Sequence, residues 1–168
     1  MGEKLKGFIK DLVQSLIIAI IIVFILFQFV LISVEVEGSS MEPNLYAKQR
    51  GVSFIITKNF GINRFDIVVI DSDKSDALLV KRVIGMPNEI IKYEDNKLYI
   101  NGEYVEEDFL GDVYTGDFEK QLGEDEYFCL GDNRDVSRDS RFYGPFHLKE
   151  LRASNIFIYY PFSDFGLK

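Results

Sequence analysis

The chain offers few side chains that could carry out covalent catalysis. It contains one histidine, His147, and one cysteine, Cys129. A Ser-His-Asp triad would have to use His147, and a Cys-His pair would also need Cys129, which lies in an apolar strand-like run. Because zinc sites need several Cys or His ligands, we expect no metal and no cofactor. The acidic loop at 132–139 has Ser137 where a calcium loop needs glycine, and its arginines oppose a cation.

A serine can instead be activated by a neutral lysine. A lysine normally keeps its proton up to a pH of about 10.4, but burial among apolar groups lowers this pKa by several units. Lys81 fits this requirement, because in LLVKRVI it shares one strand face with Leu79 and Val83. The alternative is an edge-strand lysine that reaches water or prevents aggregation, and the pattern alone favours it.

The candidate nucleophile lies in the stretch GSSMEP at 38–43. Gly38 permits unusual backbone dihedrals, and Pro43 biases the preceding residue towards an extended conformation, so we expect a constrained turn. One reading makes Ser39 and Ser40 ordinary turn formers. The other makes one of them a nucleophile, with backbone N–H groups of the turn as an oxyanion hole.

This turn closely follows a run of 23 uncharged residues, 12–34. As a helix the run would span roughly 35 Å, which is enough for a bilayer core. We expect a retained transmembrane anchor, because a cleavable signal peptide would have a shorter apolar region followed by small residues. Ser40 would then lie within roughly 20 Å of the outer end of the anchor.

Charge predicts the orientation of this anchor. Residues 1–11 carry +1, with three lysines against two acidic residues, which leaves −9 for residues 35–168 in a chain whose total is −8. The positive-inside rule predicts a short cytoplasmic tail at 1–11, a single-pass anchor at 12–34 in the cell membrane, and an extracytoplasmic domain at 35–168. An acidic domain without a basic patch does not predict nucleic-acid binding.

The rest of the chain is predicted to be mainly β, a sheet or barrel formed by short strands. The expected strands are apolar or β-branched runs separated by turns, at 52–57, 66–71, 77–84, 97–105 and 154–160, and in 126–133, where a strand ends in a polar loop. Asn101-Gly102 is a strong hairpin signal inside the fourth run. Only 146–152 indicates a helical turn, so the pattern does not favour βαβ units.

Four stretches, in order, carry a resemblance to the type I signal peptidase family, the membrane-anchored Ser-Lys proteases that remove signal peptides. They are SMEP (40–43), RFDIVVI (64–70), VKRVIGMPNE (80–89) and GDNRDVSRDSRFYGP (131–145). The last stretch is long and specific, whereas the first alone would be weak. The resemblance reverses the preference at Lys81 in favour of a catalytic lysine.

The resemblance implies a role for each matched residue. Ser40 would attack the scissile carbonyl, with its backbone N–H as an oxyanion donor, and Lys81 would be the base. Ser137 would hydrogen-bond and orient the Lys81 amine, and Met41 would lie beside the small substrate pockets. Supporting partners would be Arg82, Asp132, Arg134, Asp139 and Arg141.

The implied partners are signal peptides of preproteins and membrane lipid, with small residues at positions −1 and −3 before the cut. The chain departs from the family pattern at Asn44, often Thr, and at Gly38, where some relatives have a hydroxyl. Two alternatives stay open. One is a Ser-Lys protease of the self-cleaving repressor type, which the anchor opposes, and the other is a non-catalytic membrane-tethered β-domain that binds peptides or partner proteins.

Overall fold

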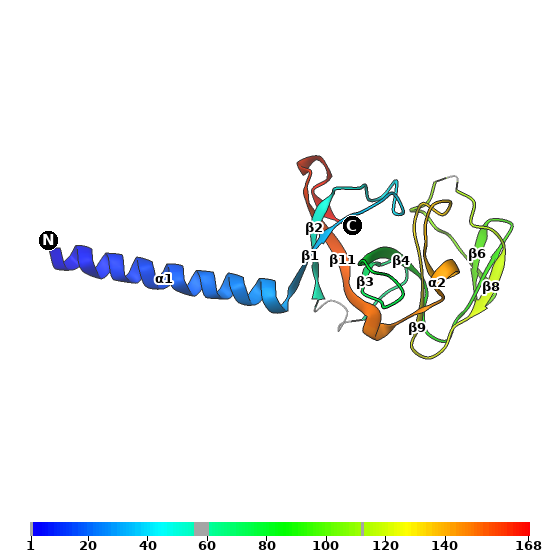
Figure 1. The fold of residues 1–168 in the computed structure, drawn as a ribbon, viewed down its shortest axis with the longest axis horizontal. Coiled ribbons are helices and arrows are strands. Elements are labelled where there is room, and N and C mark those ends of the chain that lie inside the picture. The colour runs from blue at the N-terminus through cyan, green and yellow to red at the C-terminus, as the bar shows by residue number, and fades with distance from the viewer. Residues whose placement is uncertain (1, 56–60, 112) are drawn as a thin grey trace.

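The structure is a computed structural model that describes residues 2–55, 61–111 and 113–168. Helix α1, Gly2–Phe29, projects away from a β-rich body (Figure 1). Residues Lys6–Leu26 of this helix have a mean hydropathy of 2.5 and are not buried against the rest of the chain, so they are long and apolar enough to cross a membrane. The prediction of a mainly β chain preceded by one apolar helix is confirmed.

The body consists of two antiparallel sheets. In the described residues the larger sheet has the order β1-β2-β11-β3-β4-β9-β10, with β12 paired to β11, and the smaller has the order β7-β6-β5-β8. The strands of the larger sheet are β1 (Leu31–Glu35), β2 (Arg50–Phe54), β3 (Ile67–Ile70), β4 (Leu79–Gly85), β9 (Glu126–Leu130), β10 (Phe146–His147), β11 (Leu151–Tyr160) and β12 (Gly166–Leu167). Those of the smaller sheet are β5 (Ile90–Glu94), β6 (Lys97–Ile100), β7 (Glu103–Val105) and β8 (Phe118–Gln121). Short helical turns are α2 (Ser140–Tyr143), η2 (Leu148–Glu150) and η3 (Phe162–Asp164).

The predicted hairpin and helical turn are both present. Asn101 and Gly102 join β6 to β7 with φ values of 52° and 87°, the left-handed conformation that this turn requires. The helical turn expected within 146–152 is η2. The strand expected at 52–57 ends at Phe54, and its last two residues lie outside the described residues.

The apolar run at 12–34 is not one helix. Helix α1 ends at Phe29, and Leu31–Glu35 pair with Arg50–Phe54 as β1 and β2. Val34 and the following Val36 are buried in the core, with exposures of 4% and 3%. The extension of the helix to Val34 was therefore wrong, because tertiary burial of the two valines favours an extended chain that alternates between core and solvent.

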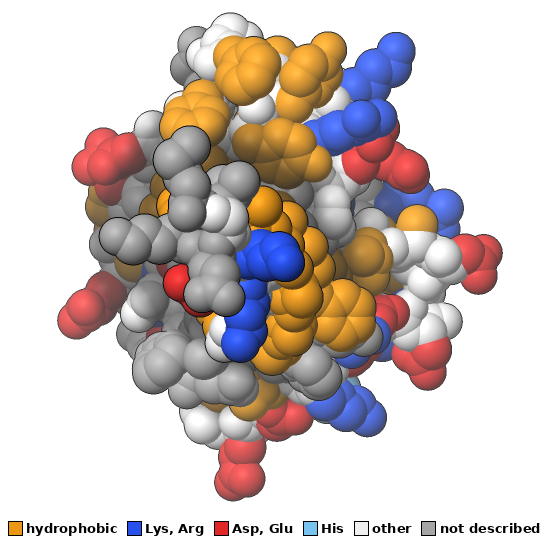
Figure 2. Space-filling view, turned by 90° about the vertical axis from the view of Figure 1, so that its left-hand side faces the viewer, with side chains coloured by type: hydrophobic (Ala, Val, Ile, Leu, Met, Phe, Trp, Pro, Cys, Tyr) orange, Lys and Arg blue, Asp and Glu red, His pale blue; other side chains and the backbone are white. Residues whose placement is uncertain are grey.

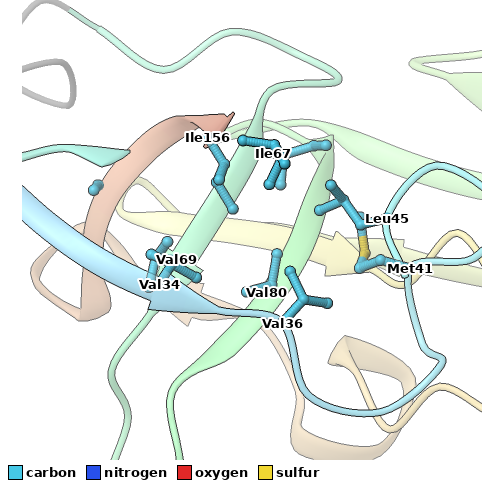
Figure 3. Close-up of a cluster of buried hydrophobic side chains, with 10 residues drawn as sticks. Val34, Val36, Met41, Leu45, Ile67, Val69, Val80 and Ile156 are labelled. Carbon is cyan, nitrogen blue, oxygen red and sulfur yellow. The ribbon is translucent and has the colours of Figure 1, made fainter. Parts of the chain in front are cut away.

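One hydrophobic cluster fixes the turn that follows β1. Met41 and Leu45 of this turn pack in one cluster with Val36, which follows β1, and with Val80 and Ile67 of the larger sheet (Figure 3). Both side chains are almost completely buried, at 1% and 0% exposure. The turn that carries Ser40 is thus anchored to the core directly after the nucleophile position, so its backbone is held by packing and not only by local turn chemistry.

Candidate active site

Ser40 and Lys81 meet in one cleft. The Lys81 Nζ lies 2.8 Å from the Ser40 Oγ and 2.8 Å from the Val80 carbonyl oxygen. The cleft has a volume of about 430 Å³ and is lined by the segments 35–41 and 77–81, together with Val136, Arg138 and Tyr143. Ser39 also lines it but is exposed, and no hydrogen bond joins its side chain to Lys81 in the described residues. The geometry therefore selects Ser40 as the partner of Lys81.

The position of Lys81 in the sheet explains its burial. Strand β4 lies between β3 and β9, with Lys81 opposite Val68. Lys81 is only 3% exposed. Desolvation by burial lowers the pKa of its amine from 10.5 to about 8, against the opposing effects of Asp139, Cys129 and Asp132. A substantial fraction of Lys81 is consequently neutral at mildly alkaline pH, as a general base requires.

One salt bridge and one hydrogen bond to Asp132 hold the polypeptide on either side of the Ser40–Lys81 contact. Arg82, next to Lys81, forms a bidentate pair with Asp132 at 2.8 and 2.7 Å. Asn44, in the turn after Ser40, donates its Nδ2 to the same carboxylate at 2.9 Å. Asp132 thus connects the turn that carries Ser40 to strand β4, which carries Lys81. Asn44 has a structural role here, because its amide supplies the donor on the side of the turn.

The loop between β9 and α2 is held by its own arginines and acids. Asp139 accepts hydrogen bonds from the Gly131 backbone N–H at 3.1 Å and from Arg141 Nε and Nη2, both at 2.9 Å. Arg141 also donates to the Arg134 carbonyl at 2.6 Å. The loop contacts the turn that carries Ser40 through the Asn133 N–H, which donates to the Ser40 carbonyl at 3.0 Å.

Ser137 does not make the predicted hydrogen bond to Lys81. Its Oγ atom is buried but has no hydrogen-bond partner among the described residues. The predicted bond was wrong for this structure, because the Lys81 amine is directed at Ser40 and Val80 instead. The hydroxyl nevertheless lies at the site, since a Cβ built on Gly131 would come 2.2 Å from Ser137 Oγ and 2.4 Å from the Ser40 carbonyl oxygen.

The histidine and the cysteine have other environments. His147 is not among the residues that line the cleft, and its Nδ1 lies 3.6 Å from Asp125 Oδ2. Cys129 is fully buried, and burial raises the pKa of its thiol far above the usual range, which makes it an inert thiol. In the described residues no cluster of three or more His, Cys, Asp and Glu side chains has the arrangement of a metal site.

Sequence patterns did not indicate several residues that complete the cleft. Val136, Arg138 and Tyr143 line it from the 131–145 stretch, where the resemblance assigned them no role. Arg138 stacks on the rings of Phe142 and Tyr143, at 4.3 and 5.6 Å from the two ring centroids. No local pattern reports such stacking, because it depends on how the loop folds back over α2.

Comparisons with known proteins show which family the chain resembles. Residues 9–160 match the protein family described as signal peptidase, peptidase S26. The chain is 34% identical to signal peptidase I of Bacillus licheniformis, over 95% of this chain and 92% of that protein. It is 32% identical to signal peptidase IB of Staphylococcus aureus (strain COL), over 96% of this chain and 94% of that protein. A crystal structure of a signal peptidase I from Enterococcus faecalis V583 is similar at a TM-score of 0.53 and 35% identity, covering 55% of this chain and 95% of that one.

Proposed function

The chain belongs to the signal peptidase family, peptidase S26, and on that basis we propose that it is a membrane-anchored serine endopeptidase that removes signal peptides with a Ser40–Lys81 dyad. The family supports the coarser part of this statement, cleavage of signal peptides by a serine protease. The contact of 2.8 Å between a buried amine and a serine hydroxyl supports the dyad more than any other observation.

The reaction uses the neutral Lys81 amine. Ser40 gives its proton to Nζ while Oγ attacks the scissile carbonyl, and the Ser40 backbone N–H stabilises the oxyanion. The protonated Lys81 then gives that proton to the leaving amine, which leaves an acyl-enzyme. A water molecule, deprotonated by Lys81, attacks the ester. Lys81 then returns this proton to Ser40 Oγ, and the signal peptide leaves with a free carboxyl group. A neutral amine has two N–H groups and one lone pair. The lone pair receives the proton of Ser40, and one N–H is directed at the Val80 carbonyl oxygen.

The cleft suits an extended peptide. Two segments, 35–41 and 77–81, line it and carry Ser40 and Lys81 respectively. A peptide inserted between them would add a strand, with main-chain hydrogen bonds for affinity and side-chain pockets for specificity. Met41 and Val80 line this cleft and are both buried. We propose that they restrict positions −1 and −3 to small residues.

Helix α1 would bring this cleft to the membrane that holds the substrate. Only Val30 separates α1 from β1, and residues 36–39 separate β1 from Ser40. Figure 2 views the molecule from the side on which α1 projects and shows hydrophobic side chains at the centre of this face and above it, with Lys and Arg beside them. Enzyme and signal peptide would share one bilayer, which raises the local substrate concentration without new contacts. The amino terminus would be cytoplasmic and the catalytic body extracytoplasmic.

A cleavage assay tests the proposal. The purified full chain in detergent is given a preprotein with an Ala-x-Ala site, and wild type is compared with Ser40→Ala, Lys81→Ala and Ser39→Ala. We expect loss of at least about a thousandfold in kcat for the first two variants and near-wild-type activity for Ser39→Ala. Equal cleavage by Ser40→Ala would refute the dyad, and a wild-type chain that binds the preprotein without cleaving it would indicate a peptide-binding domain.

A further inference from the structure

Arg134 connects the smaller sheet to the catalytic loop, and we propose that Glu107 and Tyr93 are positioning residues that hold Ser40 against Lys81 through this arginine. Both residues lie outside the four stretches that resemble the family. The inference rests on the proposed function, because it concerns how that site is held. Neither residue lines the cleft, so neither is proposed to touch the substrate.

The Arg134 guanidinium makes several hydrogen bonds inside the protein. Its Nη2 donates to Glu107 at 2.6 Å, and its Nη1 donates to the Tyr93 hydroxyl at 2.9 Å and to Thr115 Oγ1 at 2.7 Å. Its Nε donates to the Gly131 carbonyl at 3.0 Å. Arg134 is only 2% exposed, so these contacts replace water and fix the orientation of the side chain.

Tyr93 and Glu107 also bind one another. The Tyr93 hydroxyl donates to the Glu107 carboxylate, with both oxygens at 2.9 Å. Burial raises the pKa of this phenol far above its usual range, so it stays a donor at every pH of interest. The Arg134 guanidinium therefore binds the Glu107 carboxylate, and Tyr93 of strand β5 fixes the position of that carboxylate.

Arg134 is also linked to Ser40 through the backbone of Gly131 and Asn133. Arg134 fixes Gly131 through its carbonyl, and Gly131 packs against the Ser40 carbonyl and Ser137 Oγ too closely to accept a Cβ. The residue before Arg134, Asn133, donates its backbone N–H to the Ser40 carbonyl at 3.0 Å. A shift of Arg134 would therefore displace Ser40 relative to Lys81.

The segment 107–109 also contacts residues close to Ser40 and to Lys81. Two residues after Glu107, the Phe109 carbonyl accepts from Asn44 Nδ2 at 2.8 Å, and the Phe109 ring lies 4.1 Å from the Arg82 guanidinium. Asn44 follows Ser40 by four residues, and Arg82 adjoins Lys81. Residues 107–109 thus contact the serine turn, the lysine strand and the catalytic loop, although the smaller sheet supplies no cleft-lining residue among those described.

The experiment compares Glu107→Gln and Tyr93→Phe with matched exposed controls, Glu106→Gln and Tyr104→Phe, in the full chain in detergent. Misplacement by about 1 Å can lower catalysis by roughly a hundredfold, so we expect at least a roughly tenfold fall in kcat for the buried variants, with KM within about twofold. Neither control should change kcat. Tyr93→Phe removes only one hydroxyl, and it keeps the test valid if Glu107→Gln fails to fold.

A purely structural role would give a different result. Folded Glu107→Gln and Tyr93→Phe proteins that unfold at a lower temperature yet keep the wild-type kcat would overturn the proposal. Amide hydrogen exchange of residues 131–139 gives a readout that does not need activity. Faster exchange in Glu107→Gln but not in Glu106→Gln supports the positioning role, and unchanged exchange contradicts it. If wild type itself does not cleave, the proposed function fails, and hydrogen exchange alone decides on the positioning residues.

Discussion

Burial of Lys81 destabilises the folded protein whenever the amine carries a proton. Its pKa is about 8 in the folded protein against 10.5 for an exposed lysine. Below pH 8 both folded and unfolded chains bind the proton, so the folded chain must bury a charge. Between about 8 and 10.5 the unfolded chain binds the proton and the folded chain does not, so stability rises with pH in this window.

Lys81→Met tests this linkage. Methionine fills a similar volume without a charge, so the variant should lose the rise in stability between pH 8 and 10.5. At pH 7 its free energy of unfolding should exceed that of wild type by up to about 3 kcal/mol. Urea unfolding of both proteins in detergent at pH 7, 9 and 10 gives the two slopes. If the unfolding free energy of both proteins rises equally with pH, a group other than Lys81 causes the rise.

At the residue scale, the sequence predicted that Ser40 and Lys81 act together, and the structure places Lys81 Nζ 2.8 Å from Ser40 Oγ. Lys81 was singled out by the resemblance to a family, because its strand pattern alone favoured an edge-strand lysine. The predicted bond from Ser137 to Lys81 is absent, because it depends on loop placement within a fraction of an ångström. Glu107 and Tyr93 gave no sequence signal, since their contacts with Arg134 cross 27 and 41 residues.

The loop between β9 and α2 depends on one close backbone approach. A Cβ on Gly131 would lie 2.2 Å from Ser137 Oγ and 2.4 Å from the Ser40 carbonyl oxygen, closer than any real contact. Gly131→Ala should therefore displace the nucleophile turn and lower kcat by roughly a hundredfold in the preprotein assay.

Gly123→Ala is the matched control for this loop. Its Cβ would meet only Glu126, at 3.5 Å, which is ordinary contact, so kcat should stay within about twofold of wild type. A Gly131→Ala protein with wild-type kcat would show that the loop does not position Ser40.

Elements with local signals were predicted better than those fixed by distant partners. The hairpin at Asn101-Gly102 follows from the conformations that these two residues adopt readily. Strand β8, Phe118–Gln121, was missed because its sequence FEKQ is mostly polar and only its pairing with β5 makes it a strand. The end of α1 was missed for a similar reason. Residues 31–34 continue the uncharged run of the helix, and only their pairing with β2 makes Leu31–Glu35 a strand.

At the scale of the whole molecule, an aromatic surface lies on the sheet that follows helix α1. Tyr159, Tyr160, Phe162 and Phe165 line a hollow of about 550 Å³ together with Lys48, Arg50 and Glu35 at the end of β1. Phe162 is 82% exposed. Aromatic rings and basic side chains are typical of the membrane–water interface, so this surface is expected to face lipid when α1 spans the bilayer.

The absence of tryptophan from the chain allows a direct test. Phe162→Trp in the full chain, reconstituted into vesicles with brominated lipids, should show strong quenching of its fluorescence. Phe142→Trp is the control, because Phe142 is also exposed but lies in α2, farther from the helix (Figure 1). Equal quenching at both positions, or none at Phe162→Trp, would contradict this placement.

The fold class could be predicted from composition and short apolar runs, but the division into two sheets could not. Strand β11 pairs with both β2 and β3, and Ser154 of β11 lies opposite Phe54 of β2, one hundred residues earlier. Such pairings are decided by burial in the assembled core and not by local propensity. The same is true of the cleft, whose walls come from three separate parts of the chain.

A titration of the Lys81 amine in the folded protein tests the Ser40–Lys81 mechanism most directly. The signal of lysine labelled with ¹³C at Cε can be followed by NMR from pH 6 to 11 and assigned by comparison with Lys81→Met. A midpoint near 8 is expected, matching the acid limb of kcat/KM for preprotein cleavage. A midpoint near 10.5, with full activity at pH 8, would mean that another group takes the proton from Ser40.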